Sequence, residues 1–156
     1  MTVTYRSAAV DDAGTIHALL VENAVNDGGM IRGNVASLAR YGFEGGLFRS
    51  VLAEEAGRAV GLALVLPEYS SWRGRVGLLV QDLYVIPAMR GRGVGRALLA
   101  EALRVCADWE PAFLTLLVQH KNKAAQAFYA TQGFVMREQA DMLICEGEAL
   151  VRLSGT

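Results

Sequence analysis

The sequence predicts an α+β fold in which a mixed, mostly antiparallel and twisted sheet is flanked by helices. Alternating apolar runs in the middle of the chain predict an antiparallel meander, and segments with helical spacing of apolar residues stand before and after it. Two short strand-like runs follow near the end of the chain. The full order, β-α-α-β-β-β-α-β-α-β-β, predicts about six to seven strands and about four helices.

The length of the chain favours one domain over residues 1–156. A chain of this size buries roughly 70% of the surface that its unfolded form exposes, which is enough for a core without disulfides or metal ions. The sequence contains no internal repeat, linker or low-complexity tract. We therefore expect a single domain.

The first elements are a strand at 3–8, "VTYRSA", and a helix whose N-cap is Asp11 or Asp12. Residues 26–46 are rich in glycine and weak in periodicity. They include one short helical run, "VASLARYGF", that Gly42 would stop. We expect this segment to form a substrate-specific loop.

The middle of the chain predicts three strands near residues 49–54, 58–66 and 75–86, joined by turns at "EAGR" and "SSWRG". A helix then runs to about Asp108, and a buried strand, "FLTLLV", follows it. Next come a helix, "NKAAQAFYATQ", that Gly133 ends, and closing strands near "FVMRE" and "MLICE".

The charge balance argues against a nucleic-acid-binding protein. The chain has 15 basic and 16 acidic residues and a sequence pI near 6.1, so it lacks the general positive field that nucleic-acid binding needs. The N-terminus has no apolar signal core, and no apolar run approaches the roughly 18 residues of a membrane span. These features predict a cytoplasmic protein without membrane association.

Cysteine and histidine positions predict neither a disulfide framework nor a metal site. Cys106 falls in an expected helix and Cys145 in an expected strand, without CxxC spacing. We interpret both as small core residues in a reducing compartment. His17 and His120 show no ligand spacing, so we expect no metal.

A cluster of glycine and arginine residues lies between the strand "LYVI" and the helix that follows it. Its glycines are Gly91, Gly93 and Gly95, and its arginines are Arg90, Arg92 and Arg96. Unpaired backbone N–H groups and the positive end of the helix dipole favour phosphate oxygens at such a junction. The glycines let an anion approach the backbone, and the arginines add charge-assisted contacts. Neither the P-loop nor the GxGxxG pattern fits, because the lysine of the first and the last glycine of the second are absent.

The pattern that does fit is [QR]-x-x-G-x-[GA], formed by Arg90, Gly93 and Gly95. Here the chain resembles the GNAT acetyltransferase superfamily, whose members bind the pyrophosphate of acetyl-coenzyme A with this loop. The resemblance extends over "YRSAAVDDAGTI", "QDLYVIPAMRGRGVGRALL" and "NKAAQAFYATQGF". The stretches "PEYSSWRG" (67–74) and "YGFEG" (41–45) are similar to the diamine (spermidine/spermine) and thialysine N-acetyltransferase branch. The resemblance also implies a homodimer.

The resemblance assigns a set of residues to acetyl-coenzyme A. In the family the strand before the loop splays from its neighbour, so that backbone groups at the positions of Leu83 and Val85 pair with the pantetheine arm. Asn122 matches a residue that hydrogen-bonds the cofactor, or it is the N-cap of its helix. Phe128 packs in the core or forms a wall for the pantetheine. The implied cofactor residues are Leu83, Tyr84, Val85, Arg90, Gly91, Arg92, Gly93, Val94, Gly95, Arg96, Asn122 and Phe128.

Acetyl transfer to an amine requires a neutral amine. An alkyl amine of pKa about 10.4 is only about 1 part in 2,500 neutral at pH 7, a penalty of roughly 4.6 kcal/mol. Asp82 is the candidate base, acting through water, or it simply binds the substrate ammonium. Gln81 cannot act as a base, and we expect it to contact the substrate. Tyr69 and Trp72 lie near a turn, where we expect them to line the substrate site or a subunit interface.

The departing thiolate requires a proton. Tyr129, in "AFYATQGF", matches the tyrosine that protonates the coenzyme A thiolate in the family. A general acid of this kind raises the reaction rate by about 10² to 10⁴-fold. The alternative is an ordinary core aromatic.

These observations predict an acetyl-coenzyme A dependent N-acetyltransferase for a small primary amine, diamine-like or thialysine-like, acting by direct attack in a ternary complex. The alternatives are a GNAT enzyme for an amino acid, an antibiotic amine or a protein N-terminus, and a non-catalytic acyl-coenzyme A sensor. Gln81 and the loop "NDGGMIRGN" supply few carboxylates. We therefore expect short amines to be preferred over long polyamines.

Overall fold

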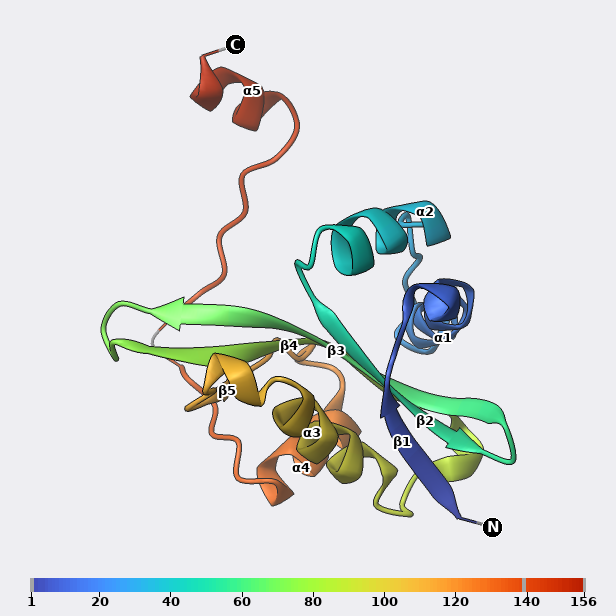
Figure 1. Cartoon of the computed structure of the whole chain (residues 1–156). Coiled ribbons are helices and arrows are strands. Elements are labelled where there is room, and N and C mark those ends of the chain that lie inside the picture. Colours follow the sequence, from blue (N-terminus) through green and yellow to red (C-terminus); the bar gives the residue numbers. More distant parts are fainter. Residues whose placement is uncertain (1, 139, 156) are drawn as a thin grey trace. The chain divides into compact units, whose positions relative to one another are not determined.

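The computed structural model describes residues 2–138 and 140–155 (Figure 1). Its contacts divide the chain into a first unit, Met1–Asn122, and a second unit, Lys123–Thr156. The single domain expected over 1–156 stays a prediction.

The first unit is built on a five-stranded sheet, and the predicted α+β class is confirmed. The order along the sheet is β1-β2-β3-β4-β5, with the first four strands antiparallel and β5 parallel to β4. The strands are β1 (Val3–Ser7), β2 (Arg49–Glu55), β3 (Arg58–Ser70), β4 (Arg75–Val85) and β5 (Leu114–Thr115).

The described residues form five strands, whereas about six to seven were expected. Residues 134–138 and 142–146, the expected closing strands, form no strand in the described part of the chain. The expected strand "FLTLLV" is reduced to two residues. A strand requires a neighbour with which to exchange backbone hydrogen bonds, and alternation of side chains alone does not supply one.

Helices accompany the sheet in the first unit. They are η1 (Val10–Asp12), α1 (Ala13–Asn26), α2 (Val35–Leu38), η2 (Ala39–Glu44), η3 (Pro87–Met89), α3 (Val94–Val105) and η4 (Ala107–Trp109). Asp12 does precede α1, but its side chain makes no capping hydrogen bond to that helix. Its carboxylate instead accepts from the Ala9 N–H at 2.7 Å and pairs with Arg6 at 2.8 Å. No described helix reaches the length and apolar character that crossing a membrane requires.

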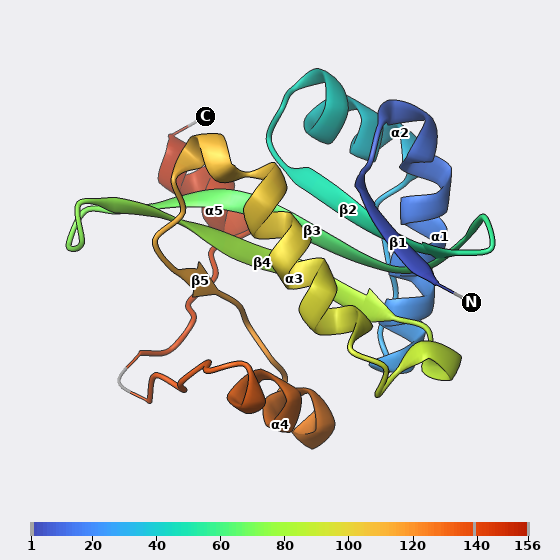
Figure 2. The same cartoon turned by 60° about the horizontal axis from the view of Figure 1, so that its bottom comes forward.

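The two faces of the sheet carry different helices (Figures 1 and 2). On the face that we call the α1 face, Leu52, Leu62 and Tyr84 stand side by side on three strands. They join one buried cluster with Ile16 and Leu20 of α1. Helix α3 contacts β1 to β4, and we call the face it covers the α3 face.

Close contact on the α3 face depends on a glycine. A Cβ built on Gly61 would lie 3.2 Å from Leu98 Cδ1 and 2.8 Å from the Tyr84 carbonyl oxygen. Because Leu98 is fully buried, a larger residue at this position would displace packed core atoms.

The second unit contains α4 (Lys123–Thr131) and α5 (Glu148–Ser154). Helix α4 ends as predicted, with Gly133 in the left-handed region at φ 91°. Cys106 is buried as expected, whereas Cys145 is exposed. The core position expected for Cys145 is therefore wrong, because the strand that would have buried it does not form.

Candidate functional site

The junction between β4 and α3 has the geometry of an anion-binding loop. Gly91 and Gly93 adopt left-handed conformations, with φ 73° and 79°, and Gly93 is the N-cap of α3. A Cβ on either glycine would meet nothing within 4 Å, so conformation rather than packing demands glycine here. The first intrahelical bond runs from the Ala97 N–H to the Gly93 carbonyl, which leaves earlier N–H groups of the first turn without helical partners.

The arginines of this loop differ in their contacts. Arg90 Nε donates to the Val85 carbonyl at 2.9 Å, and its Nη2 donates to Asn26 Oδ1 at 3.4 Å. Arg92 pairs with Glu55 at 3.2 Å. Arg96 is exposed and pairs with no acidic residue in the described ranges. The loop thus fits a diphosphate, with backbone N–H groups and one uncommitted guanidinium, and the assignment of these residues to the cofactor stays a prediction.

A β-bulge in β4 defines the centre of the site. Leu64 pairs with Asp82 and Val65 pairs with Val80, so Gln81 is an extra residue without a partner on β3. One extra residue reverses the direction in which the following backbone groups point. Asp82 is thereby placed on the α1 face opposite Leu64, while Gln81 is exposed.

Beyond the bulge, β4 separates from β5. The two strands pair only at Leu78 and Leu79 of β4. Further along, the Ile86 N–H donates to the Val60 carbonyl on β3 at 3.0 Å, so alternation directs the backbone groups of Leu83 and Val85 to the opposite, open edge. This is the edge at which the resemblance expects the pantetheine arm, and the contact itself stays a prediction.

Two of the expected cofactor residues have buried side chains. The Tyr84 ring is only 5% exposed and belongs to the core on the α1 face. Val94 is 2% exposed at the start of α3, so only its backbone is available to a diphosphate. Their side chains stabilise the elements that form the site, because burying apolar surface is favourable.

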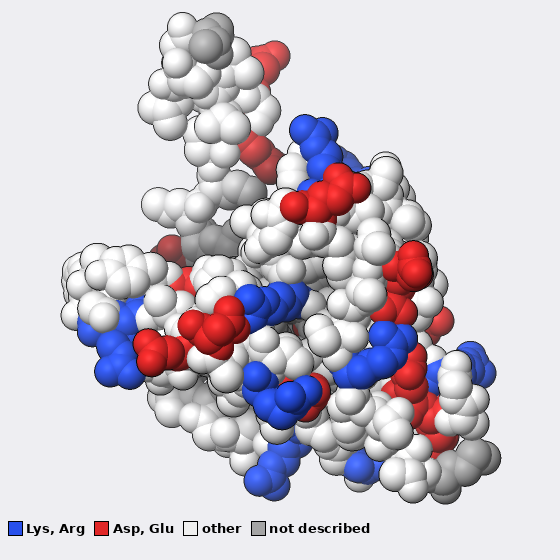
Figure 3. Space-filling view, in the orientation of Figure 1, with Lys and Arg blue, Asp and Glu red and all other residues white. Residues whose placement is uncertain are grey.

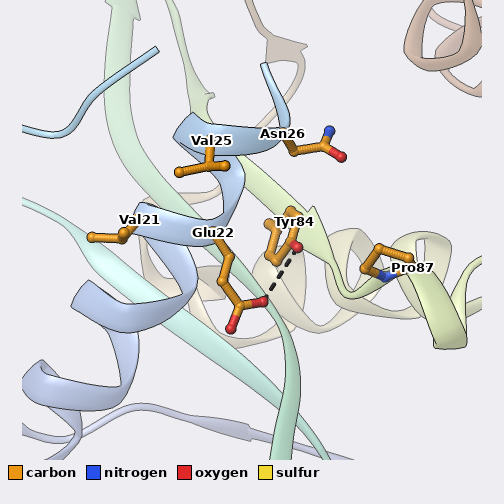
Figure 4. Close-up of a pocket in the computed structure, with 6 residues that line it drawn as sticks. All are labelled: Val21, Glu22, Val25, Asn26, Tyr84 and Pro87. Atoms are coloured by element: carbon orange, nitrogen blue, oxygen red, sulfur yellow. Dashed lines mark hydrogen bonds between the residues drawn. The ribbon is translucent and has the colours of Figure 1, made fainter. Parts of the chain in front are cut away.

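A shallow pocket of about 380 Å³ lies beside Tyr84 (Figure 4). Its lining residues are Val21, Glu22, Val25, Asn26, Tyr84 and Pro87. The Tyr84 hydroxyl donates to Glu22 Oε2 at 3.3 Å. Sequence reasoning missed Glu22, which is exposed on α1 three residues after the buried Leu19.

The carboxyl group of Asp82 is half-buried, and this burial raises its pKa above the ordinary value of an aspartate. No salt bridge or hydrogen bond joins it to another residue in the part of the chain that the structure describes. A carboxylate in this state is a better base than an exposed one, and it is available to a cation from outside the protein.

We expect Asp82→Asn to stabilise the fold at neutral pH. A raised pKa in the folded state means that the ionised form opposes folding above that pKa. The melting temperature of Asp82→Asn should therefore exceed that of the wild type at pH 7. The difference should shrink as the pH falls from the raised pKa toward 3.8, the ordinary value, because the wild-type carboxyl is then protonated in the folded state. Thermal melts from pH 4 to 8 measure this, and a constant difference would contradict it.

Tyr69 lies near the end of β3 and Trp72 in the turn between β3 and β4, and they are 68% and 98% exposed. Neither lines the pocket beside Tyr84. Their role as a substrate wall or an interface stays a prediction. The face in Figure 3 shows acidic and basic side chains interspersed, which agrees with a formal net charge of −1. Within the described residues, no group of three His, Cys, Asp or Glu side chains gathers that could hold a metal.

The remaining site residues lie at the boundary of the two units and beyond it. Asn122 ends the first unit, where its N–H donates to the Gln119 carbonyl at 2.9 Å. In the second unit the Tyr129 ring makes edge contacts with Phe128 and Phe134, with centroids 5.2 and 5.3 Å apart. These contacts hold the Tyr129 ring in a fixed aromatic group. Its assignment as the proton donor stays a prediction.

Known proteins share both sequence and fold with this chain. A thialysine N-epsilon-acetyltransferase from Bos taurus is 34% identical over 99 residues, which span 62% of this chain and 58% of the bovine protein. The uncharacterized N-acetyltransferase YhfO from Bacillus subtilis is 31% identical over 84 residues, 54% of this chain and 56% of that protein. The chain therefore spans little more than half the length of these two curated relatives. The thialysine N-epsilon-acetyltransferase of Sus scrofa is 29% identical over 168 aligned positions, covering 99% of this chain and 98% of the pig protein.

Solved structures agree on the fold. An integron cassette protein from V. cholerae superposes with a TM-score of 0.81 at 19% identity, over 100% of this chain and 99% of that chain. A predicted acetyltransferase with acetyl-CoA from Clostridium acetobutylicum gives a TM-score of 0.76 at 16% identity, covering 92% and 96%. The model of the acetyltransferase (GNAT) family matches residues 18–134. The resemblance is confirmed: the chain belongs to the GNAT family of acetyltransferases.

Proposed function

We propose that this chain is an acetyl-coenzyme A dependent N-acetyltransferase for a small primary amine, diamine-like or thialysine-like. The bulge at Gln81 carries the proposal. It places Asp82 on the α1 face and turns the backbone of Leu83 and Val85 to the open edge of β4, so a base and a binding edge for the donor are adjacent in one strand.

Within a ternary complex, the protein's task is to move two protons. Asp82 accepts a proton from the substrate ammonium through water, which leaves a neutral amine. The amine nitrogen then attacks the carbonyl carbon of the thioester and loses its second proton to water, and the carbon–sulfur bond breaks. Tyr129 donates a proton to the departing thiolate, and water restores it. The products are the N-acetylated amine and free coenzyme A.

The loop after β4 supplies binding rather than chemistry. Backbone N–H groups at the start of α3 and the exposed Arg96 suit a diphosphate. The carbonyl of Val85 already accepts a hydrogen bond from Arg90 Nε. This bond holds the end of β4 in place at its open edge. Holding the donor along this edge converts acetyl transfer into a reaction between neighbouring groups.

The relatives support the amine class. Two of them are named thialysine N-epsilon-acetyltransferases, and a lysine-like amine suits a site in which Gln81 replaces a carboxylate. A homodimer and a cytoplasmic location stay predictions.

An amine panel tests this function. Thiol release should show a higher kcat/KM for thialysine or a short diamine than for spermine, since few carboxylates are present to pair with additional ammonium groups. Asp82→Asn should lower kcat/KM for all of them at neutral pH. A clear preference for spermine, or full activity of Asp82→Asn, would contradict the proposed pocket.

A further inference from the structure

Glu68 continues the α1 face of β3 toward the hairpin. Leu62, Leu64 and Leu66 occupy alternate positions and pack on or against the buried cluster of that face. Because side chains alternate along a strand, Glu68 lies on the same face. It is opposite Gly77 on β4. An acidic residue thus follows three leucines on the face that also carries Asp82.

The carboxylate of Glu68 is held by a hydroxyl across β4. Thr115 of β5 donates from Oγ1 to Glu68 Oε2. Gly77, which is opposite Glu68 on β4, has no side chain. A Cβ built on Gly77 would lie 2.3 Å from the nearest atom of the Phe113 ring, so this ring fills the space. The acid is therefore half-buried and oriented rather than free in solvent.

Glu68 has no cationic partner among the residues that the structure describes, since none of the ion pairs of those residues includes it. A carboxylate that accepts one neutral hydrogen bond still has lone pairs for a charged donor. A cation supplied by a ligand would therefore find an acceptor at this carboxylate.

The position of Glu68 relative to Asp82 suits a second amino group. The open edge at Leu83 and Val85 lies on one side of Asp82, and Glu68 lies on the other, opposite Gly77. Asp82 pairs with Leu64, four residues from Glu68, so the two positions are about 13 Å apart along the strand. A spacing of this size leaves room for a short carbon chain between a nitrogen beside Asp82 and a second nitrogen hydrogen-bonded to Glu68.

We propose that Glu68, oriented by Thr115, determines specificity by binding the second, non-reacting ammonium group of the acceptor. The inference rests on the proposed function and names its substrate class: short amines with two cationic nitrogens, such as a five-carbon diamine or a lysine-like amino acid. Spermine carries additional ammonium groups beyond the two that Asp82 and Glu68 would bind.

The test compares 1,5-diaminopentane with n-pentylamine, which differ by one amino group. Glu68→Gln should lower kcat/KM for the diamine about tenfold and for pentylamine less than about twofold, because it removes the charge and keeps an oxygen that accepts from Thr115. The KM for acetyl-coenzyme A should not change. Thr115→Val should give a smaller loss with the same preference. Glu101→Gln removes the same charge on α3, where Glu101 pairs with Arg104, and should leave the ratio of the two amines unchanged.

The outcomes separate this inference from the proposed function. If the wild type acetylates no primary amine, both fail. If it acetylates amines but the ratio of diamine to pentylamine is the same in Glu68→Gln, the inference is wrong and the function stands. Because the ratio is measured within one variant, a loss of stability that lowers both rates equally also counts against Glu68.

Discussion

Gly93→Val is expected to abolish the thermal stabilisation of this protein by acetyl-coenzyme A. A ligand present at 100 times its dissociation constant stabilises the native state by about 2.7 kcal/mol, or about 5 to 10 °C for a chain of this size. Gly93 has φ 79° at the N-cap of α3, a conformation that a β-branched residue adopts only under strain. The added methyl groups would also stand in the open space where a diphosphate would meet the backbone.

Gly74→Val is the matched control. Gly74 has φ 60°, and a Cβ there likewise meets nothing within 4 Å, but it lies in the hairpin between β3 and β4. Its backbone strain should lower the melting temperature of the free protein by a similar amount, while the shift caused by acetyl-coenzyme A persists. A wild type without any shift at millimolar coenzyme A, or a Gly93→Val variant that keeps the full shift, would show that the loop does not bind the cofactor.

The loop was predictable from sequence because its determinants are local. Left-handed glycines at the start of a helix follow from residue types within a few positions, and Gly91 and Gly93 adopt such conformations. Gly133, which follows the end of α4, also adopts a left-handed conformation. The meander from β2 to β4 was equally evident from alternation and turn residues.

The centre of the site depends on pairing between strands, and local patterns do not contain that information. The bulge at Gln81 exists only relative to β3, and the contact between Glu68 and Thr115 requires β5 to stand beside β4. Glu68 follows a proline in the sequence and looks like one more polar residue before a turn. Likewise, "MLICE" alternates like a strand, yet Leu143 is 93% exposed and has no strand partner in the described ranges.

Arg90 connects the loop to the acceptor side of the first unit. It donates to the Val85 carbonyl and to Asn26 at the end of α1, and its guanidinium lies 5.7 Å from the Tyr84 ring centroid. Tyr84 in turn donates to Glu22. The predicted cofactor loop, the open edge and the pocket beside α1 are therefore held by one set of contacts, which favours a site whose parts are already placed before ligands bind.

Tyr129→Phe should keep cofactor binding and lower turnover by about 10 to 10³-fold. The substitution removes one proton donor and almost no volume, and the ring keeps its edge contacts with Phe128 and Phe134. The melting temperature and the shift with acetyl-coenzyme A should therefore stay close to those of the wild type. The KM for the amine should change little, because the loss falls on the step in which the thiolate takes its proton.

The measurement is kcat by thiol release, from pH 6 to 10, beside Tyr5→Phe as a matched loss of one hydroxyl on β1. If Tyr129 is the acid, the fall of kcat at high pH in the wild type reflects its deprotonation and should be absent from Tyr129→Phe. A core aromatic would give a different result: both variants would match the wild type in kcat and in pH profile. Equal turnover of Tyr129→Phe and Tyr5→Phe would therefore remove Tyr129 from the mechanism and leave solvent as the source of the proton.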